Sequence, residues 1–459
     1  MAKQKAISRR TFLNRALAGG GSLTLLNFWP AFHILTSKTR KRPNILLIIS
    51  DQQGLDTFSS LNIPHVHTPN LDRLKARGTF FRQSYSVNPI CSPARSSLFT
   101  GRMPSETGVI HNGLAIRSDL PNLGQWLAQN GYRTVYAGKW HLPNGYTTSI
   151  AGFEVLPAGL LLRGTVGDAT VARACEGFLR NYASDRPFFM VASFLQPHDI
   201  CSWIERHRRT LKTLPLQGIE DQLPGLPPNM DARPPEPEKA RIARRPQWNA
   251  LNWRYYLWSY YRMVEEVDRE IGLLLDALQD TGLDENTLII FTSDHGEGRG
   301  RHGSVLKNFL YEEAVKVPLV ISFPAHLNEN RISDRLVSTP DIAPTICDFA
   351  GLPAPPGSRG RSLKPLLLGK NFNDRGFVVA EVMRDQGRMI RNERFKLIAY
   401  RNDPQIQLFD LQNDPWETQN VAGEARFAAE LKALKKELEN WEKTLDLAPN
   451  ALGPFRFGE

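Results

Sequence analysis

Short apolar runs alternate with amphipathic stretches over most of the chain. The apolar runs occupy residues 44–50, 132–137, 188–195 and 288–292. Runs this short and this apolar indicate strands that are buried on both faces, as in a parallel sheet. Helical patterns lie between them, notably over residues 71–78 and 255–278. The alternation predicts an α/β fold with a mostly parallel sheet flanked by helices.

Polar and ionisable residues follow each of these four runs. The clusters are Asp51-Gln52-Gln53, Lys139-Trp140-His141, Gln196-Pro197-His198-Asp199 and Asp294-His295-Gly296-Glu297. In open α/β sheets, ligands bind beyond the carboxyl ends of the strands. Loops are often polar simply because they are solvated, so one such cluster would be weak evidence. Four of them predict a single site where the strand ends meet.

The pattern changes in the last quarter of the chain. Short strand-like runs at residues 377–380, 389–391, 395–398 and 407–409 indicate an antiparallel sheet, and residues 430–445 form an amphipathic helical pattern. We therefore expect a large domain over residues 43–370 and a smaller α+β subdomain over residues 371–459. Arg391 of this subdomain either reaches the substrate pocket or makes a structural salt bridge.

Residues 199–254 form a poorly patterned segment rich in proline and arginine. This segment is either a solvated surface loop or a cationic rim that gathers an anionic polymer. The aromatic residues that follow it, from Trp253 to Tyr261, are expected mainly to pack a helix, although one or two could stack on a sugar.

The formal net charge of +10 comes almost entirely from one end of the chain. Residues 1–42 hold nine of the 57 basic residues and no acid, which leaves 48 basic against 47 acidic residues in the remainder. The body of the protein is thus nearly neutral, which argues against nucleic acid as a partner.

The N-terminal segment has the features of a targeting sequence. Arg9-Arg10 in the context SRRTFL precedes a weakly apolar run over residues 16–35 that contains glycines, Pro30 and His33. Such a run is too polar for a membrane span. It resembles a twin-arginine export signal, so we expect residues 1–36 to direct the protein through an export machinery to the periplasm or the extracellular space. A flexible basic tail is the alternative.

Four cysteines, Cys91, Cys175, Cys201 and Cys347, are widely spaced and lack the C-x-x-C pattern of a structural zinc site. By default, Cys175 and Cys347 are small buried apolar residues. If Cys91 is modified, at least one of the other three stays unpaired within a monomer.

Cys91 opens the segment CSPARSSLFTGR, residues 91–102. This segment resembles the sulfatase signature, C-x-P-x-R followed by T-G-R. Further similar stretches are TPNLD at 68–72, GKWH at 138–141, YEE at 311–313 and LFDL at 408–411. The chain is thereby identified as a member of the sulfatases, over nearly all of residues 43–420. The resemblance implies an alkaline phosphatase-like fold and hydrolysis of sulfate esters, with a sulfated saccharide or polysaccharide as the expected substrate.

The resemblance also implies a modified nucleophile. A separate maturation enzyme oxidises the cysteine, here Cys91, to formylglycine, and Pro93 and Arg95 help that enzyme to recognise its target. One hydroxyl of the hydrated aldehyde attacks sulfur and displaces the alcohol. The other then loses its proton, so that the aldehyde reforms and sulfate leaves. Arg95 is expected to stabilise the hydrate.

A divalent metal ion is implied as well. Its expected ligands are Asp51, Gln52, Asp294, His295 and the modified Cys91. Calcium is the usual ion of the family, but Gln52 and His295 stand where Asp or Asn is common. Calcium prefers oxygen ligands, whereas imidazole suits manganese or another transition metal, so the identity of the ion stays open. Alternatively, the His295 ring points toward substrate oxygen.

The remaining polar residues receive roles by the same resemblance. Lys139 and Lys307 contact the sulfate, where preorganised cations stabilise developing charge. His141 assists deprotonation of the hydrate, and His198 protonates the leaving alcohol, alone or with Lys307. Asp199 orients His198 or faces substrate. His302, in a glycine-rich loop, is either part of this site or merely exposed.

Two other function classes stay open. A phosphonate or phosphate monoester hydrolase of the same superfamily would suit Asp51-Gln52 with Asp294-His295 equally well. A non-catalytic carbohydrate-binding relative would not need the complete polar set. The sequence leaves the oligomeric state undetermined.

Overall fold

The computed structural model of the chain divides into two compact units, Met1–Lys41 and Arg42–Glu459. The structure describes residues 42–158, 163–207, 218–245, 247–327 and 329–457. The predicted export signal, residues 1–36, lies outside the described residues. Everything that follows concerns the second unit. None of the helices in the described ranges combines the length and apolar character needed to cross a membrane.

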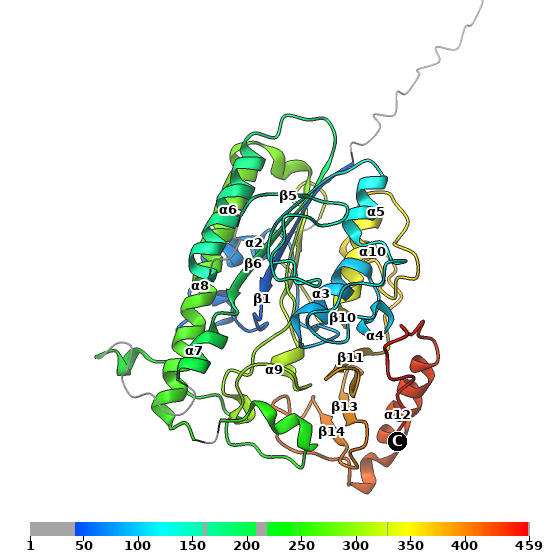
Figure 1. The fold of residues 1–459 in the computed structure, drawn as a ribbon. Coiled ribbons are helices and arrows are strands. Elements are labelled where there is room, and N and C mark those ends of the chain that lie inside the picture. The colour runs from blue at the N-terminus through cyan, green and yellow to red at the C-terminus, as the bar shows by residue number, and fades with distance from the viewer. Residues whose placement is uncertain (1–41, 159–162, 208–217, 246, 328, 458–459) are drawn as a thin grey trace, which may run out of the picture. The chain divides into compact units, whose positions relative to one another are not determined.

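A large mixed sheet forms the centre of this unit (Figure 1). Its strand order is β5-β4-β6-β1-β7-β8-β2-β9. The bounds are β1 Asn44–Asp51, β2 Thr79–Phe81, β4 Arg133–Gly138, β5 Glu154–Val155, β6 Phe188–Pro197, β7 Thr287–Ser293, β8 Leu319–Ser322 and β9 Arg331–Ser333. Strands β5, β4, β6, β1 and β7 run parallel, and β8 pairs antiparallel with β7 and β2. The predicted mostly parallel sheet and its four buried strands are confirmed.

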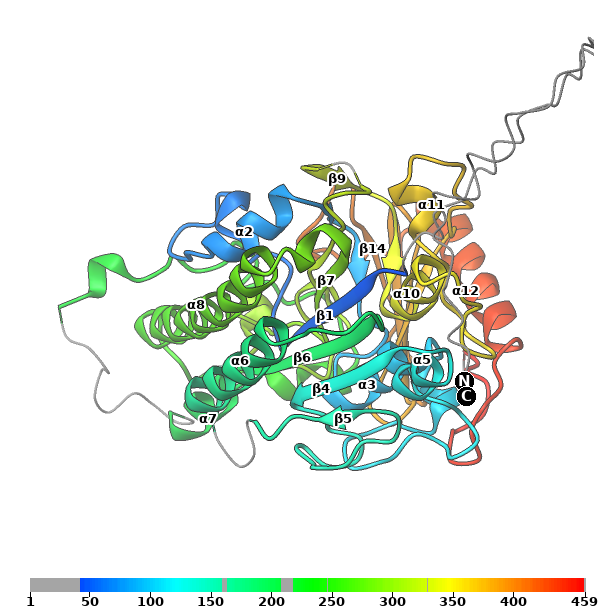
Figure 2. The same ribbon diagram turned by 90° about the horizontal axis from the view of Figure 1, so that it is seen from above.

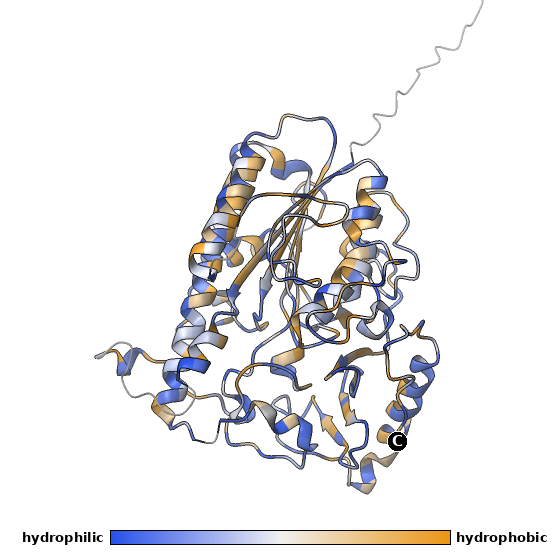
Figure 3. Ribbon diagram, in the orientation of Figure 1, coloured by the Kyte–Doolittle hydropathy of each residue, from blue (hydrophilic) through white to orange (hydrophobic). Residues whose placement is uncertain are grey.

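Helices cover both faces of this sheet (Figure 2). Their bounds are α2 Pro69–Ala76, α3 Cys91–Thr100, α4 Pro104–Thr107, α5 Leu123–Gln129, α6 Gly164–Arg180, α7 Ile200–Arg206, α8 Ala250–Asp280, α9 Glu312–Val315, α10 Ile342–Phe349 and α11 Lys364–Leu367. Alternate residues of β1 point to opposite faces. Leu46 and Ile48 pack with α2, α6 and α8, whereas Ile45 and Leu47 pack with α3, α5 and α10. Because both faces are covered, the strands are apolar along their length (Figure 3).

The C-terminal part forms the predicted antiparallel sheet and helix. The sheet consists of β11 Val378–Val382, β12 Gly387–Arg391, β13 Phe395–Tyr400 and β14 Gln407–Asp410 in sequential order, and α12 spans Ala428–Glu442. Helix α12 packs on one face of this sheet, where Leu434 and Leu438 contact the strands. The other face packs on Tyr85 and on residues around α9. A further two-stranded pairing joins β3, Ser84–Tyr85, to β10, Val337–Ser338.

The segment 199–254 contains more regular structure than its sequence indicates. It begins with α7, and its last five residues belong to α8, while residues 208–217 lie outside the described part. Trp203, Trp248, Trp253 and Tyr256 pack into one buried cluster. These aromatic side chains therefore serve helix packing.

Candidate active site

Helix α3 presents Cys91 at its first residue and Arg95 one turn later. The helix ends at Gly101, whose φ of 71° is in the left-handed region that glycine adopts without strain. Residues four apart lie on the same helix face. Cys91 and Arg95, both buried, therefore point together toward the ends of the central strands.

The register of the sheet brings three of the predicted polar clusters side by side. Strand β1 lies between β6 and β7, with Asp51 opposite Pro197 and Ser50 opposite Ser293. Asp51 thus ends β1, and His198 and Asp294 directly follow its two neighbours β6 and β7. Lys139 follows β4, the next strand in the sheet, and is also buried.

The Cys91 sulfur lies at the centre of this arrangement. It is 3.2 Å from His295 Nε2, 3.7 Å from Asp51 Oδ1, 3.2 Å from Lys307 Nζ and 3.8 Å from Lys139 Nζ. Burial and the Asp51 carboxylate oppose ionisation of the thiol. The positive charges of Lys139, Lys307 and His295 outweigh them and lower the pKa of Cys91 well below its ordinary value.

Arg95 joins the two carboxylates of the site. Its Nη2 donates to Asp51 at 3.0 Å and its Nε donates to Asp294 at 2.9 Å, while Lys139 Nζ contacts Asp51 at 2.7 Å. Burial opposes the charge of Asp51, but the surrounding cations, Lys139 first, hold its pKa well below the usual range. Burial and the neighbouring Asp51 raise the pKa of Asp294.

Four of the five predicted metal ligands meet in the structure. Asp51, Cys91, Asp294 and His295 each offer a ligand atom, and these atoms all lie within 4.8 Å of one another. His295 Nδ1 lies 2.9 Å from the carbonyl oxygen of Gly296. If the ring loses a proton to a bound metal ion, donation from Nδ1 to this carbonyl leaves Nε2, which faces the sulfur, free to act as the ligand. Two carboxylates and an imidazole fit a divalent ion.

Gln52, the fifth predicted ligand, is held between two charged groups. Its Nε2 donates to Glu297, and its Oε1 accepts from Lys307 Nζ. Glu297, fully buried, also accepts from the hydroxyl of Tyr256 and from the backbone N–H of Leu306. The amide oxygen of Gln52 therefore faces the ammonium group beside Cys91.

The predicted proton-transfer residues occupy different positions. His198 interacts electrostatically with the Cys91 side chain, and burial, followed by the charges of Lys139 and Lys307, lowers its pKa to about 4. The backbone oxygen of His141 accepts from Ser92 Oγ at 2.6 Å. Nδ1 of the His141 ring is buried and has no partner among the described residues.

Three side chains with open roles have structural contacts. Arg391, at the end of β12, donates to Gln83 at 2.6 Å and to the hydroxyl of Tyr85, so it joins the C-terminal sheet to β3 and the residue before it. His302 is buried, not exposed, with Nδ1 2.9 Å from Glu313. Asp199 accepts from the backbone N–H of Gly164 at 2.8 Å, and no contact with the His198 ring is present among the described residues.

The sequence analysis placed Glu297 in one of the polar clusters but assigned no role to it or to Cys201. Cys201, in the first turn of α7, lies 3.4 Å from Gln52 Nε2. Burial raises the pKa of its thiol to about 11, so it stays protonated. All four cysteines are free thiols. The only sequence signal for the two missed residues is their position, three residues beyond Asp294 and His198 respectively.

Comparisons with known proteins agree with this geometry. The family model "Sulfatase" matches residues 43–352, and the model "N-sulphoglucosamine sulphohydrolase, C-terminal" matches residues 300–444. A Delta 4,5-hexuronate-2-O-sulfatase of Bacteroides thetaiotaomicron is 28% identical over 431 residues, which is 87% of this chain and 89% of the relative.

Two solved structures extend the comparison. A 2-O GAG sulfatase superposes with a TM-score of 0.78 at 26% identity, covering 88% of this chain and 92% of the other. A phosphonate monoester hydrolase of Agrobacterium radiobacter superposes with a TM-score of 0.71 at 25% identity, covering 86% and 95%. The fold and the buried polar centre define a hydrolase of the alkaline phosphatase superfamily. Within it, the chain belongs to the sulfatase family, the hydrolases of sulfuric esters.

Proposed function

We propose that the protein removes sulfate groups from a sulfated saccharide, with a formylglycine made from Cys91 as nucleophile and a divalent metal ion beside it. The observation that carries this proposal is the position of the Cys91 sulfur. It lies among two lysines, a histidine and a carboxylate at the shared end of the parallel strands. The similarity to a hexuronate 2-O-sulfatase and to a GAG sulfatase favours a saccharide as substrate.

The side chains around Cys91 have complementary tasks. Lys139 and Lys307 offer ammonium groups to the sulfate oxygens, where charge gathers as the S–O bond breaks. Arg95 holds Asp51 and Asp294 in place for the metal, which when bound supplies positive charge next to the nucleophile. His198, whose pKa is about 4 without substrate, is proposed to give a proton to the departing sugar oxygen once the negative charge of the bound sulfate raises that pKa, and His141 to accept one during release of sulfate.

The metal is calcium in this proposal, held by Asp51, Asp294, Gln52, His295 and the modified Cys91. Manganese or another transition metal is the alternative that the His295 imidazole favours. Elemental analysis of the purified protein decides between them.

Cellular handling completes the proposal. A maturation enzyme converts Cys91, and the Arg9-Arg10 pair directs the folded protein through the twin-arginine machinery to the periplasm or beyond. Replacing both arginines by lysine is expected to leave the protein in the cytoplasmic fraction.

Peptide mass spectrometry of the segment around Cys91, combined with sulfate release from a panel of sulfated saccharides, tests the chemical part. Active protein that contains only the unmodified thiol would overturn the nucleophile. Hydrolysis of phosphonate monoesters is the second candidate activity. It is favoured by the amide of Gln52, by the imidazole of His295 and by the structural similarity to a phosphonate monoester hydrolase. Faster hydrolysis of aryl phosphonates than of aryl and sugar sulfates would favour it.

A further inference from the structure

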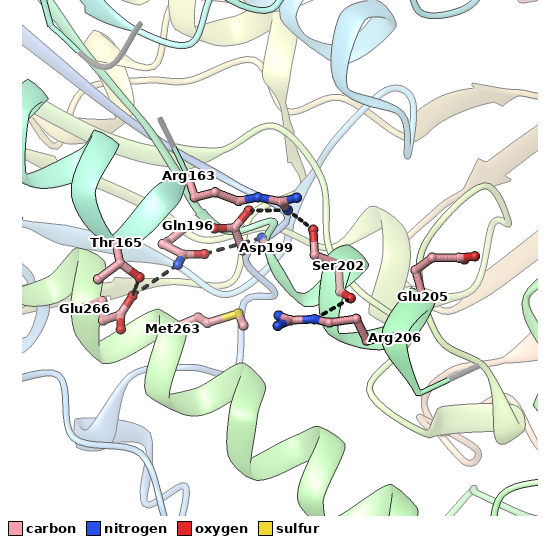
Figure 4. A pocket seen from close by; sticks show the side chains of 9 residues that line it. All are labelled: Arg163, Thr165, Gln196, Asp199, Ser202, Glu205, Arg206, Met263 and Glu266. Carbon is pink, nitrogen blue, oxygen red and sulfur yellow. Dashed lines mark hydrogen bonds and ion pairs between the residues drawn. The ribbon is translucent and has the colours of Figure 1, made fainter. Parts of the chain in front are cut away.

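A pocket with a volume of about 610 Å³ lies beside the turn that carries His198. Its walls come from the start of α6, from α7 and from the middle of α8 (Figure 4). Asp199 lines this pocket, whereas His198, the preceding residue, reaches Cys91. Consecutive Cα atoms are about 3.8 Å apart. The pocket therefore begins one residue away from the group that is placed to protonate the leaving alcohol.

Hydrogen bonds hold the pocket in a fixed relation to this turn. Asp199 accepts from the backbone N–H of Gly164 at 2.8 Å, which joins the turn to α6. Gln196 Nε2 donates to Glu266 Oε2 at 3.1 Å, which joins the turn to α8. Thr165 Oγ1 donates to the same oxygen at 3.0 Å. A ligand in the pocket would thus be held at a set position relative to His198.

Two side chains on the pocket walls have hydrogen-bonding atoms without a partner among the described residues. Glu266 Oε1 accepts no hydrogen bond among the described residues, since only Oε2 is engaged. Arg206 donates from Nε to the Ser202 carbonyl oxygen at 3.3 Å, but within the described ranges its terminal nitrogens have no ion pair or hydrogen bond. The undescribed residues 208–217 that follow α7 contain no acid that could neutralise it. Figure 4 shows the Arg206 guanidinium directed toward Met263.

The combination of these groups defines the kind of ligand. The pocket offers an acceptor at Glu266, a planar set of donors at Arg206 and an apolar surface at Met263. A sugar ring has hydroxyl groups that both donate and accept, together with apolar C–H groups. A compact anion fits less well, because Asp199, Glu205 and Glu266 outnumber the two arginines that line the pocket. A flat aryl group would leave the polar walls without partners.

We infer that this pocket binds the sugar from which the sulfate is removed, on the leaving-group side of the scissile bond. The inference rests on the proposed function and specifies where its substrate is recognised. Arg206 donates to a ring hydroxyl, Glu266 accepts from another, and Met263 packs against the C–H face of the sugar.

Two variants test this assignment. Arg206→Met removes the donors but keeps an apolar chain of similar length, and Met263→Trp fills the pocket. The substrates are 4-nitrophenyl sulfate and the best sugar sulfate from a panel that includes a 2-O-sulfated unsaturated hexuronate. For each variant, kcat/KM on the sugar sulfate is expected to fall about tenfold more than kcat/KM on 4-nitrophenyl sulfate, mainly through KM. Such a change corresponds to the loss of one or two hydrogen bonds or of the contact area.

The matched control is Arg173→Met. Arg173 lies on the exposed side of α6, where it pairs with Glu176 at 2.6 Å, outside the pocket. For the Arg173→Met variant, the ratio of kcat/KM on the sugar sulfate to kcat/KM on 4-nitrophenyl sulfate should equal that of the wild type. Inhibition by the desulfated sugar gives a second measurement: it should weaken in Arg206→Met, whereas inhibition by inorganic sulfate should not.

The possible outcomes separate this inference from the proposed function. If the wild type hydrolyses sugar sulfates and both variants keep the wild-type activity ratio and the same inhibition by the desulfated sugar, the pocket does not bind the sugar. If the matured wild type cleaves no sulfate ester, the proposed function is wrong and this inference with it. Equal thermal melting of variants and wild type shows that a change in ratio comes from binding and not from unfolding.

Discussion

Gln52 donates from its side-chain amide to the carboxylate of Glu297, and the oxygen of the same amide accepts from Lys307. A carboxylate can only accept and an ammonium can only donate, so the two partners fix which way round the amide lies. An aspartate at position 52 would place a second carboxylate near the buried Glu297. The pairing gives a physical reason for an amide at this position.

Glu297→Gln is expected to weaken metal binding. The new amide could face Gln52 in either orientation, so the oxygen of Gln52 would no longer be fixed toward the site. Loss of such an outer partner typically lowers metal affinity by about 10–100-fold. Calorimetric titration with Ca²⁺ and Mn²⁺ measures it, with the exposed Glu437→Gln on α12 as control.

Combining Gln52→Asp with Glu297→Gln sharpens this test. The double variant removes the carboxylate pair that Gln52→Asp alone creates, and it should recover part of the lost affinity. Additive losses would show that Glu297 does not act through Gln52.

Asp294→Ala should abolish metal content and activity together. The substitution removes a metal ligand and also leaves Arg95 with one carboxylate partner instead of two. Elemental analysis and turnover of 4-nitrophenyl sulfate measure the two effects, and Asp276→Ala on the surface of α8 is the control. A variant that keeps full metal occupancy and rate would show that the metal site is elsewhere.

His198→Ala is expected to harm sugar sulfates more than aryl sulfates. A sugar alkoxide needs a proton as it departs, whereas a phenolate with an acidic parent needs one much less, and general acid catalysis contributes about 10²–10⁴-fold. The loss should appear in kcat and grow with the pKa of the leaving alcohol. Equal losses on all esters, with an unchanged melting temperature, would assign His198 to sulfate binding instead.

Glu417 should make stability depend on pH. Burial, with Glu312 and Glu313 nearby, raises its pKa to about 7 despite the attraction of Lys396. The unfolded value is about 4.3, so the folded state binds more protons between these limits. The contribution of this group to the free energy of unfolding therefore falls as pH rises from about 4 to about 7.

Glu417→Gln tests this relation. The free energy of unfolding of the variant relative to wild type should rise by on the order of 2 kcal/mol between pH 5 and pH 8. Its melting temperature relative to wild type should rise over the same range. Differential scanning calorimetry measures it. A difference that is constant across this range would contradict the raised pKa.

Much of the fold follows from local pattern. β1, β4, β6 and β7 were predictable because strands covered on both faces need continuous apolar runs. β8 and β9 are only four and three residues long, so their sequences give too little pattern to identify them. α7 was not predicted because its seven residues lie in a segment rich in proline and charge.

The site residues that lie at the ends of the parallel strands were predictable from the sequence. Asp51, His198 and Asp294 lie at the ends of adjacent parallel strands, so their clusters converge whatever the loops do. The partners of Gln52 and the burial of His302 depend on loops that return from distant parts of the chain, such as the approach of Glu417 to His302. No local sequence pattern encodes such contacts.

The pocket beside His198 is built from α6, α7, α8 and the end of β6, and none of its lining residues lies on β1, β7 or α3. Asp51 ends β1, Asp294 directly follows β7, and Cys91 begins α3. A library of variants at positions in the helical walls, such as 206 and 263, could therefore be selected for cleavage of sulfate esters with a different leaving alcohol. The buried charges that break the sulfur–oxygen bond would be inherited unchanged, so the scaffold lends itself to directed evolution of leaving-group preference.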